Sequence, residues 1–248
     1  MRIIISPAKK MNEDTDSLEW LSLPCFLANT EEICRCMQQM GYDELKRLWK
    51  CNDQIAALNV ERLERMELRK NLTPAILAYE GIQYQYMAPG VFTTQELDYV
   101  QEHLRILSGF YGLLRPFDGV SPYRLEMQAR LSVASAKDLY AYWGNKLAEK
   151  LFEETDCIIN LASKEYSLCV SKHLRDDIRF ISCVFGEEKG GKIIEKGTIC
   201  KMARGEMVRY MAEKQISDPD DIKSFDRLNY SFSPERSDES SFVFVLKK

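Results

Sequence analysis

The sequence predicts a single mixed α/β domain of the α+β kind, spanning residues 1–248, with a mixed central sheet and surrounding helices. Three observations support this prediction. Short apolar runs typical of buried strands lie between amphipathic helical patterns, without the regular alternation of a βαβ array. No internal repeat, low-complexity linker or shift in composition divides the chain. A hydrophobic content of 45% is enough to fill one sizeable core.

The first half of the chain predicts one strand followed by several helices. Arg2–Ile5 reads as a short buried strand that stops at Ser6-Pro7. Three helical patterns follow: one from Glu31 toward Met40 capped by Thr30, one capped by Asp43, and one that starts near Asp53 with Ile55, Leu58, Leu63 and Met66 inward. Thr73-Pro74 opens a fourth, short helix. Residues 79–92 are expected to form a connection that contains at most a short strand.

The central stretch, residues 105–127, predicts a helix followed by a glycine-rich turn. Thr93 and Glu96 form a capping box, and Leu97, Val100, Leu104 and Leu107 then mark one helix face. Gly109 stands where this helix would end, and Gly112 allows a second tight turn. Glycines three apart expose backbone amides that can hold a phosphate, and Arg105, Arg115 and Arg124 would add charge. The alternatives are an ordinary turn and a helix-hairpin-helix that grips duplex DNA without reading its sequence.

The second half predicts the remaining strands and helices. A helix is expected over residues 136–152, with Gly144 inside it as a sign that something approaches the backbone closely. Strands are expected at residues 156–161, 180–185 and 192–200, the last two joined as a hairpin across Gly190-Gly191. A helix over 202–215, a short one from Asp218-Pro219 to Phe225 and a terminal hairpin complete the chain.

Composition excludes several classes of function. No apolar run reaches 18 residues and the N-terminal run is too short for a signal peptide, so a cytoplasmic protein without membrane contact is expected. The eight cysteines form no C-x-x-C pair and the two histidines lack partners at ligand spacing, so no metal and no cofactor is predicted. The net charge of -4 means that an anionic ligand needs a local basic cleft. Residues 189–214 carry a local excess of four positive charges, which fits such a cleft or a solvated helix face.

Polar side chains gather where two predicted strands end. Ser6, Lys9 and Lys10 follow the first strand, and Asn160, Ser163 and Glu165 lie at the end of the strand at 156–161. Ligands of open sheets bind at the carboxyl ends of strands. Asn160 could instead tie a loop to the sheet.

Two other segments add candidate residues to these strand ends. Lys201 and Arg204 share one helix face, beside Gly205, which leaves room for a backbone or a phosphate. Glu126 follows Tyr123 and Arg124 and could act as a general base, although an ion pair with Arg124 or Arg130 is favoured.

Together these segments resemble the YaaA family of bacterial peroxide-stress proteins. The resemblance rests on motifs in family order: residues 5–9, 107–116, 122–127, Tyr140 with Trp143-Gly144, residues 159–166, and Lys201 with residues 203–205. It implies a cytosolic protein that protects against hydrogen peroxide and limits iron-dependent damage. It also implies a helix-hairpin-helix at residues 108–114 beside a basic cleft. Lys9-Lys10 departs from the family's usual Lys-Thr, so a hydroxyl at position 10 is not essential.

The sequence supports three functional hypotheses. The first is non-specific binding of double-stranded DNA, in which the amides of Gly109–Gly112 hold a phosphate and Arg105, Arg115, Arg124, Lys201 and Arg204 line the cleft. The second is an enzyme acting on a nucleotide, a nucleobase or damaged DNA, with Ser6, Lys9, Glu126, Asn160, Ser163 and Glu165 as candidate catalytic residues. The third is an iron-handling or redox role of the cysteines, which no ligand spacing supports.

Overall fold

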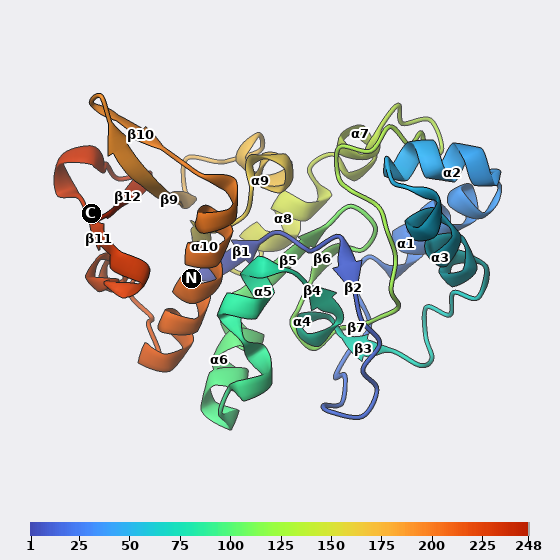
Figure 1. Ribbon diagram of the computed structural model, residues 1–248, viewed down its shortest axis with the longest axis horizontal. Helices are drawn as coiled ribbons and strands as arrows, with labels where there is room; N and C mark the ends of the chain where they lie inside the picture. The colour runs from blue at the N-terminus through green and yellow to red at the C-terminus, as the bar shows by residue number, and fades with distance from the viewer. Residues whose placement is uncertain (248) are drawn as a thin grey trace.

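The computed structural model describes residues 1–247 and is built around one mixed eight-stranded sheet (Figure 1). Its strand order is β11-β12-β9-β8-β1-β5-β6, with β10 attached to β9. The bounds of these strands are β1 Arg2–Ile5, β5 Leu104–Ser108, β6 Gly112–Leu114, β8 Cys157–Asn160, β9 Arg179–Lys189, β10 Lys192–Ile194, β11 Tyr230–Phe232 and β12 Ser241–Leu246. This arrangement confirms the predicted mixed α/β fold.

The central strand is β1, which pairs in parallel with both β5 and β8. Ile3, Ile4 and Ile5 are completely buried, which explains why the run of three isoleucines shows no alternation. The parallel pairs continue from β8 to β9 and from β9 to β12, whereas β6, β10 and β11 are antiparallel to their neighbours. The carboxyl ends of β1, β5 and β8 therefore meet on one edge of the sheet.

Helices cover the sheet and form one end of the molecule. Figure 1 shows α1–α3 gathered at the end opposite the C-terminal strands, with α10 alongside α5 and α6. The helices are α1 Leu27–Gln38, α2 Tyr42–Trp49, α3 Asp53–Glu64, α4 Ala75–Ala78, α5 Ile82–Met87, α6 Thr94–His103, α7 Leu139–Trp143, α8 Lys146–Phe152, α9 Lys164–Ser171 and α10 Gly197–Lys214. Short 3-10 turns lie at η1 Pro89–Val91, η2 Pro219–Ser224, η3 Arg227–Asn229 and η4 Pro234–Arg236. Two small ladders pair β2 Lys10–Met11 with β4 Tyr79–Glu80, and β3 Thr73–Pro74 with β7 Gly119–Val120.

Most predicted elements are present, with shifted boundaries. The first strand, the three N-terminal helices, the hairpin across Gly190-Gly191 and the terminal hairpin are confirmed. The cap of α2 is Gly41, whose amide bonds the Glu44 carboxylate, rather than Asp43. The predicted strand over 192–200 stops at Ile194, and α10 begins at Gly197. In α3, Ile55 and Leu58 are exposed, because the core side of this helix is formed by Ala56, Asn59 and Leu63.

The predicted helix-hairpin-helix at residues 108–114 is wrong. The capping box of Thr93 and Glu96 is present, but the helix ends at His103. Residues 104–108 form β5, which lies between β1 and β6 and is buried along its whole length. A short apolar run fits a helix face and a buried strand equally well, and here the space beside β1 decides in favour of a strand. The turn after this strand joins a β-hairpin, β5–β6. A pair of helices with a short connection lies instead at α2–α3, joined by residues 50–52.

Two glycines explain further boundaries. Gly144 divides the predicted helix over 136–152 into α7 and α8, because its φ of 52° is left-handed and ends α7. Nothing approaches its backbone closely, so the predicted reason for this glycine was wrong. Gly205 does allow a close approach, since a Cβ there would lie 2.0 Å from the carbonyl oxygen of Gln83 in α5. The contact between α10 and α5 depends on this missing side chain.

We expect Gly205→Ala to lower the free energy of unfolding by about 1–3 kcal/mol, because α10 and α5 must move apart. Gly197→Ala is the matched control in the same helix, since a Cβ at Gly197 meets nothing within 4 Å. The control should change stability little or raise it slightly. Urea unfolding measures both, and equal effects of the two substitutions would contradict the close contact.

Candidate functional site

A cavity of about 350 Å³ lies at the carboxyl ends of β1 and β8. Its walls come from five separated segments: residues 6–10, 80–84, 123–126, 163–166 without Lys164, and Lys201 with Arg204 from α10. These segments contain most of the polar motifs that the sequence singled out. We call this cavity the strand-end pocket. Its existence is a consequence of the topology, because β1 and β8 are parallel neighbours and deliver their following loops to the same place.

Ser6 and Ser163 join the two strand ends. The Ser163 amide donates to Ser6 Oγ at 2.8 Å, and the Ser6 hydroxyl donates to Ser163 Oγ at 3.2 Å. Ser163 also begins α9, so the positive end of that helix is directed toward the pocket. The hydroxyl of Tyr84, from α5, donates to the Ser6 carbonyl at 3.0 Å. The loop after β1 is thereby held in one position.

The two carboxylates of the pocket have different environments. Glu126 pairs with Lys9 at 2.8 Å and lies 3.8 Å from the Arg124 guanidinium, so its first partner is the lysine rather than Arg124 or Arg130. Glu165 forms no ion pair among residues 1–247; its Oε1 accepts from the Gln128 amide at 3.2 Å. Burial and the neighbouring Glu126 raise the pKa of Glu165, against the opposing effects of the backbone amides and of Lys9.

Asn160 does not line the strand-end pocket. Its side-chain oxygen accepts from the Ala162 amide at 3.0 Å, and its amide group donates to Ser182 Oγ at 3.2 Å. These bonds tie the loop after β8 to β9. Asn160 therefore ties a loop to the sheet, which is one of the two roles expected from the sequence.

Three residues that line the strand-end pocket each carry a buried donor without an acceptor among residues 1–247. They are Arg124 Nε, Arg204 Nε and Gln83 Nε2. A fourth such atom, Trp49 Nε1, belongs to the α2 region. An unpaired buried donor costs about 1–3 kcal/mol, more when it is charged. Three of these four atoms thus belong to residues that line one cavity.

The remaining predicted phosphate contacts lie elsewhere. Arg105 is only 2% exposed and binds the Glu154 carboxylate at 2.6 Å through Nη2 and 2.8 Å through Nε. Arg115 lines a second cavity of about 270 Å³, together with Arg105 and Glu154. Arg105 is therefore part of a buried ion pair and is not placed in one cleft with Lys201 and Arg204.

The glycine turn at 109–112 makes hydrogen bonds and close contacts within the protein. The amides of Phe110 and Tyr111 donate to Ser108 Oγ at 3.1 and 2.9 Å. Gly109 packs against the backbone of residues 125–127, where a Cβ would come within 2.9 Å, and Gly112 has the left-handed φ of 77° that this tight turn requires. The turn thus supports the segment that carries Arg124 and Glu126, and its Phe110 and Tyr111 amides already have an acceptor within the protein.

The contribution of α5 to the pocket is not predictable from its sequence pattern. Residues 79–92 are predicted as a connection, yet they supply Gln83 and Tyr84 to the strand-end pocket. The alternating aromatic and polar residues of this stretch give no clear helical period. Gly205 was the available signal, because it implied that some other backbone packs against α10.

All eight cysteines are free thiols. Cys34, Cys169, Cys183 and Cys200 are buried, and within residues 1–247 no three His, Cys, Asp or Glu side chains are arranged to hold a metal ion. Burial raises the pKa of Cys183 and of Cys200 to about 12. Thiols with such a pKa are poor nucleophiles. No helix of the described residues is long and apolar enough to cross a membrane.

Comparisons with known proteins place the chain in a family. Residues 1–236 match the family model described as peroxide stress protein YaaA. A UPF0246 protein of Lachnoclostridium phytofermentans is 55% identical over 245 residues, which cover 99% of this chain and 96% of the relative. A UPF0246 protein of Agathobacter rectalis is 54% identical over 247 residues, covering 100% and 99%. A third, from Pediococcus pentosaceus, is 51% identical over 245 residues, covering 99% and 98%.

We expect Arg105→Gln to lower the free energy of unfolding by about 3 kcal/mol or more, because Glu154 would remain buried with a weaker partner. Arg65→Gln is the control: Arg65 pairs with Glu61 at 2.9 Å on the surface, and its loss should cost less than about 0.5 kcal/mol. Chemical denaturation measures both. A small effect of Arg105→Gln would mean that this arginine is free for another role.

The same ion pair predicts an acid-sensitive stability. Burial alone would raise the pKa of Glu154, but the guanidiniums of Arg105 and Arg2 outweigh it and hold the pKa below its ordinary value of 4.5. The stabilisation is therefore complete above about pH 4.5 and is lost as the pH falls through the lowered pKa of the folded protein. Unfolding free energies measured from pH 6 to pH 3 should fall less steeply in Glu154→Gln than in the wild type. Parallel curves would contradict this assignment.

Proposed function

The chain belongs to the peroxide stress protein YaaA family, and we propose that it acts in peroxide stress by binding a nucleotide-like anionic molecule in the strand-end pocket. The observation that carries the proposal is the set of three buried donors, Arg124 Nε, Arg204 Nε and Gln83 Nε2, which have no acceptor among residues 1–247. A phosphate group offers several acceptor oxygens and a negative charge. Such a ligand can pair with the guanidinium groups of Arg124 and Arg204, which line the cavity.

Charge and helix direction support an anion. The pocket is lined by five basic side chains, Lys9, Lys10, Arg124, Lys201 and Arg204, and by three carboxylates, Glu80, Glu126 and Glu165. The amino end of α9 adds a partial positive charge. This local balance favours an anionic ligand even though the chain as a whole carries a net charge of -4.

Size and apolar surface support a nucleotide-like molecule rather than a bare anion. A volume of about 350 Å³ falls within the range of about 300–1,000 Å³ usual for small-molecule sites. Tyr84, Tyr123 and Tyr166 contribute aromatic walls. Aromatic rings offer stacking surfaces to a planar base.

The two carboxylates extend this proposal to catalysis. Glu126 is held by Lys9, whereas burial raises the pKa of Glu165. Two carboxyl groups with different environments can divide the roles of base and acid. An enzyme acting on a nucleotide, a nucleobase or damaged DNA is the reaction class that this arrangement favours, with Ser6 and Ser163 as further polar groups beside the ligand.

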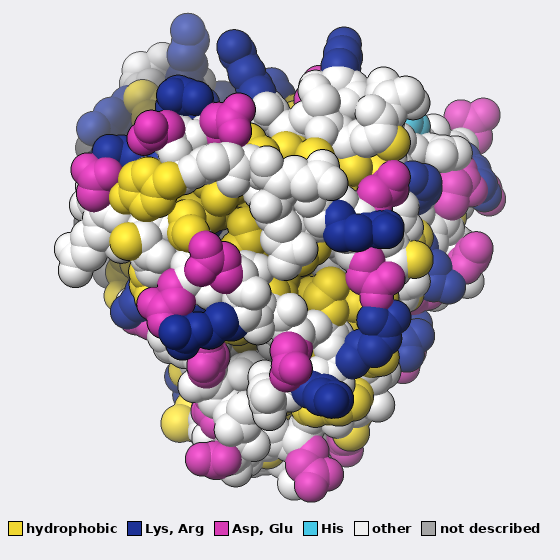
Figure 2. Space-filling view, turned by 90° about the vertical axis from the view of Figure 1, so that its right-hand side faces the viewer, with side chains coloured by type: hydrophobic (Ala, Val, Ile, Leu, Met, Phe, Trp, Pro, Cys, Tyr) yellow, Lys and Arg dark blue, Asp and Glu magenta, His cyan; other side chains and the backbone are white. Residues whose placement is uncertain are grey.

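Non-specific binding of double-stranded DNA is the second candidate, and the exposed rim of the pocket favours it. The side chains of Lys9 and Lys10 are 65% and 69% exposed, and Lys201 is also exposed. These lysines, rather than the glycine turn, would contact the phosphates. The face formed by α1–α3 is a poorer candidate, because Lys and Arg alternate there with Asp and Glu (Figure 2). Limiting iron-dependent damage stays a prediction from the family.

Calorimetric titration tests the proposal with inorganic phosphate, the four ribonucleoside 5′-monophosphates and a short DNA duplex. We expect at least one nucleotide to bind, and Arg204→Gln to weaken its binding at least tenfold by removing a charged donor. Lys192→Gln, an exposed substitution on β10, should leave the affinity unchanged.

The outcomes separate the candidates. Absence of binding by every small molecule at millimolar concentration would contradict the pocket proposal. Duplex binding that weakens with salt and is lost in Lys9→Gln with Lys201→Gln would instead support the DNA candidate.

A further inference from the structure

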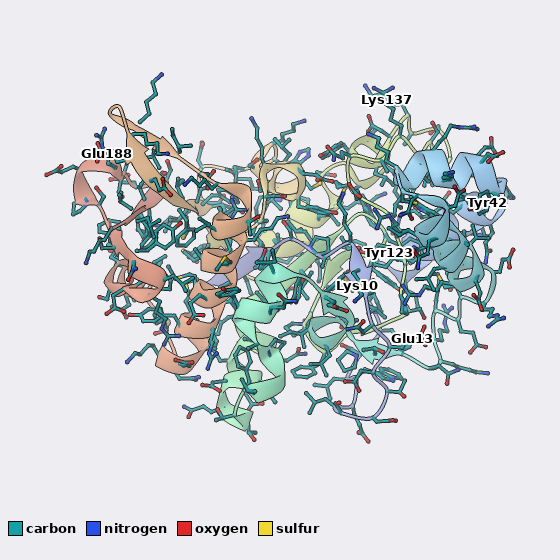
Figure 3. All side chains as sticks on the ribbon, in the orientation of Figure 1. Lys10, Glu13, Tyr42, Tyr123, Lys137 and Glu188 are labelled. Carbon is teal, nitrogen blue, oxygen red and sulfur yellow. The ribbon has the colours of Figure 1, made fainter. Side chains whose placement is uncertain are left out.

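A chain of three buried hydroxyl groups leads from the glycine turn to the strand-end pocket. The Tyr123 hydroxyl lies 2.6 Å from Ser108 Oγ and 2.9 Å from the Tyr79 hydroxyl. Tyr123 lines the pocket, whereas Ser108 and Tyr79 do not. Figure 3 shows Tyr123 inside the body of the molecule near Lys10, which lies on the pocket rim. In this chain, Tyr123 is therefore the member next to the ligand space.

The direction of the first hydrogen bond is fixed by Ser108. Its oxygen already accepts from the amides of Phe110 and Tyr111. A hydroxyl oxygen has two acceptor positions, so both are used. The Ser108 hydroxyl must therefore donate its own proton to the Tyr123 oxygen.

A count of protons leaves one without an acceptor. The three hydroxyl groups carry three protons but make only two hydrogen bonds with one another, and no other acceptor for them lies among residues 1–247. Since the Ser108 proton is used, the spare proton belongs to Tyr79 or to Tyr123. A spare proton on Tyr79, which is 3% exposed, would be a buried unpaired donor with no ligand space beside it. A spare proton on Tyr123 belongs to a residue that lines the strand-end pocket.

We infer that Tyr123 accepts hydrogen bonds from both Ser108 and Tyr79 and donates its own proton to an acceptor atom on the base of a nucleotide-like ligand. The inference rests on the proposed function and adds a requirement for an unprotonated oxygen or ring nitrogen on that base. The acceptor of the Tyr123 proton is placed on the base rather than on the phosphate for two reasons. Arg124, Arg204 and Gln83 are assigned to the phosphate in the proposed function, and the Tyr123 ring stacks on Phe110 at 4.8 Å within an aromatic cluster.

The acid–base state of Tyr123 agrees with this role. Burial raises its pKa to about 12, although the hydrogen bonds from Ser108 and Tyr79 act in the opposite direction. The phenol therefore keeps its proton throughout the physiological range. Two incoming hydrogen bonds polarise the O–H group, so it is a stronger donor to the ligand than an isolated tyrosine.

Calorimetric titration of Tyr123→Phe and Tyr79→Phe with the monophosphates and with inorganic phosphate tests the inference. Tyr123→Phe should weaken nucleotide binding about tenfold and leave phosphate binding unchanged, because one hydrogen bond to the base is lost. Tyr79→Phe also disturbs the buried cluster but keeps the Tyr123 proton, so its nucleotide affinity should stay within about threefold of the wild type. Unchanged nucleotide binding in Tyr123→Phe, or equal loss for phosphate, would overturn the inference, as would tighter binding by Tyr79→Phe.

A second measurement needs no ligand. In protein labelled at the tyrosine ζ carbon, the Tyr79 hydroxyl proton should exchange slowly with water because it is enclosed and donated to Tyr123. That slow exchange should be lost in Tyr123→Phe, which removes the acceptor of the Tyr79 proton. An unchanged Tyr79 hydroxyl signal in Tyr123→Phe would overturn the hydrogen-bond order, even if no nucleotide bound to the wild type and the proposed function had failed.

Discussion

The parallel pairing of β1 with both β5 and β8 is the constraint on which the rest of the structure depends. It buries three successive isoleucines and brings the loops after two strands to one edge of the sheet. The bonds between Ser6 and Ser163 exist only because of this register. The glycine turn after β5 packs against residues 125–127, so the same sheet also positions Arg124 and Glu126. The pairing of β1 thus brings together four segments that are distant in the sequence: the loops after β1 and β8, the glycine turn and residues 124–126.

The strand-end pocket combines rigid support with unpaired polar groups. Ser6 is held by Tyr84 and Ser163, and Glu126 is held by Lys9, whereas buried donors of Arg124, Arg204 and Gln83 lack partners among residues 1–247. Keeping such donors desolvated costs folding free energy, which a protein recovers when an acceptor binds. Groups fixed in advance need little rearrangement when the ligand arrives.

The fold class and several residues of the pocket could be predicted from the sequence. The roles of the basic residues, such as Arg105, could not. Polar residues after apolar strands indicated Ser6, Lys9, Asn160, Ser163 and Glu165 as a group, because parallel strands place their ends together. Asn160 is the exception, since it bonds Ser182 and does not line the pocket. The apolar spacing of residues 104–108 suits a helix and a buried strand equally well. Only the pairing with β1, which the sequence does not show, decides for a strand. Arg105 consequently seemed available to a ligand, although Glu154, 49 residues later, binds it. Partners so distant in the sequence leave no local pattern.

The position of β1 at the centre of the sheet also has a consequence for biosynthesis. Residues 2–5 are made before their partners, which begin at Leu104 and Cys157. During translation this apolar segment must wait for its first neighbour until β5 has been made, and for its second until β8 has been made. Contacts of such high sequence separation slow folding, and an unpaired apolar strand is open to aggregation in the meantime. The charged Lys9-Lys10 pair directly after the strand counteracts that hazard in the nascent chain.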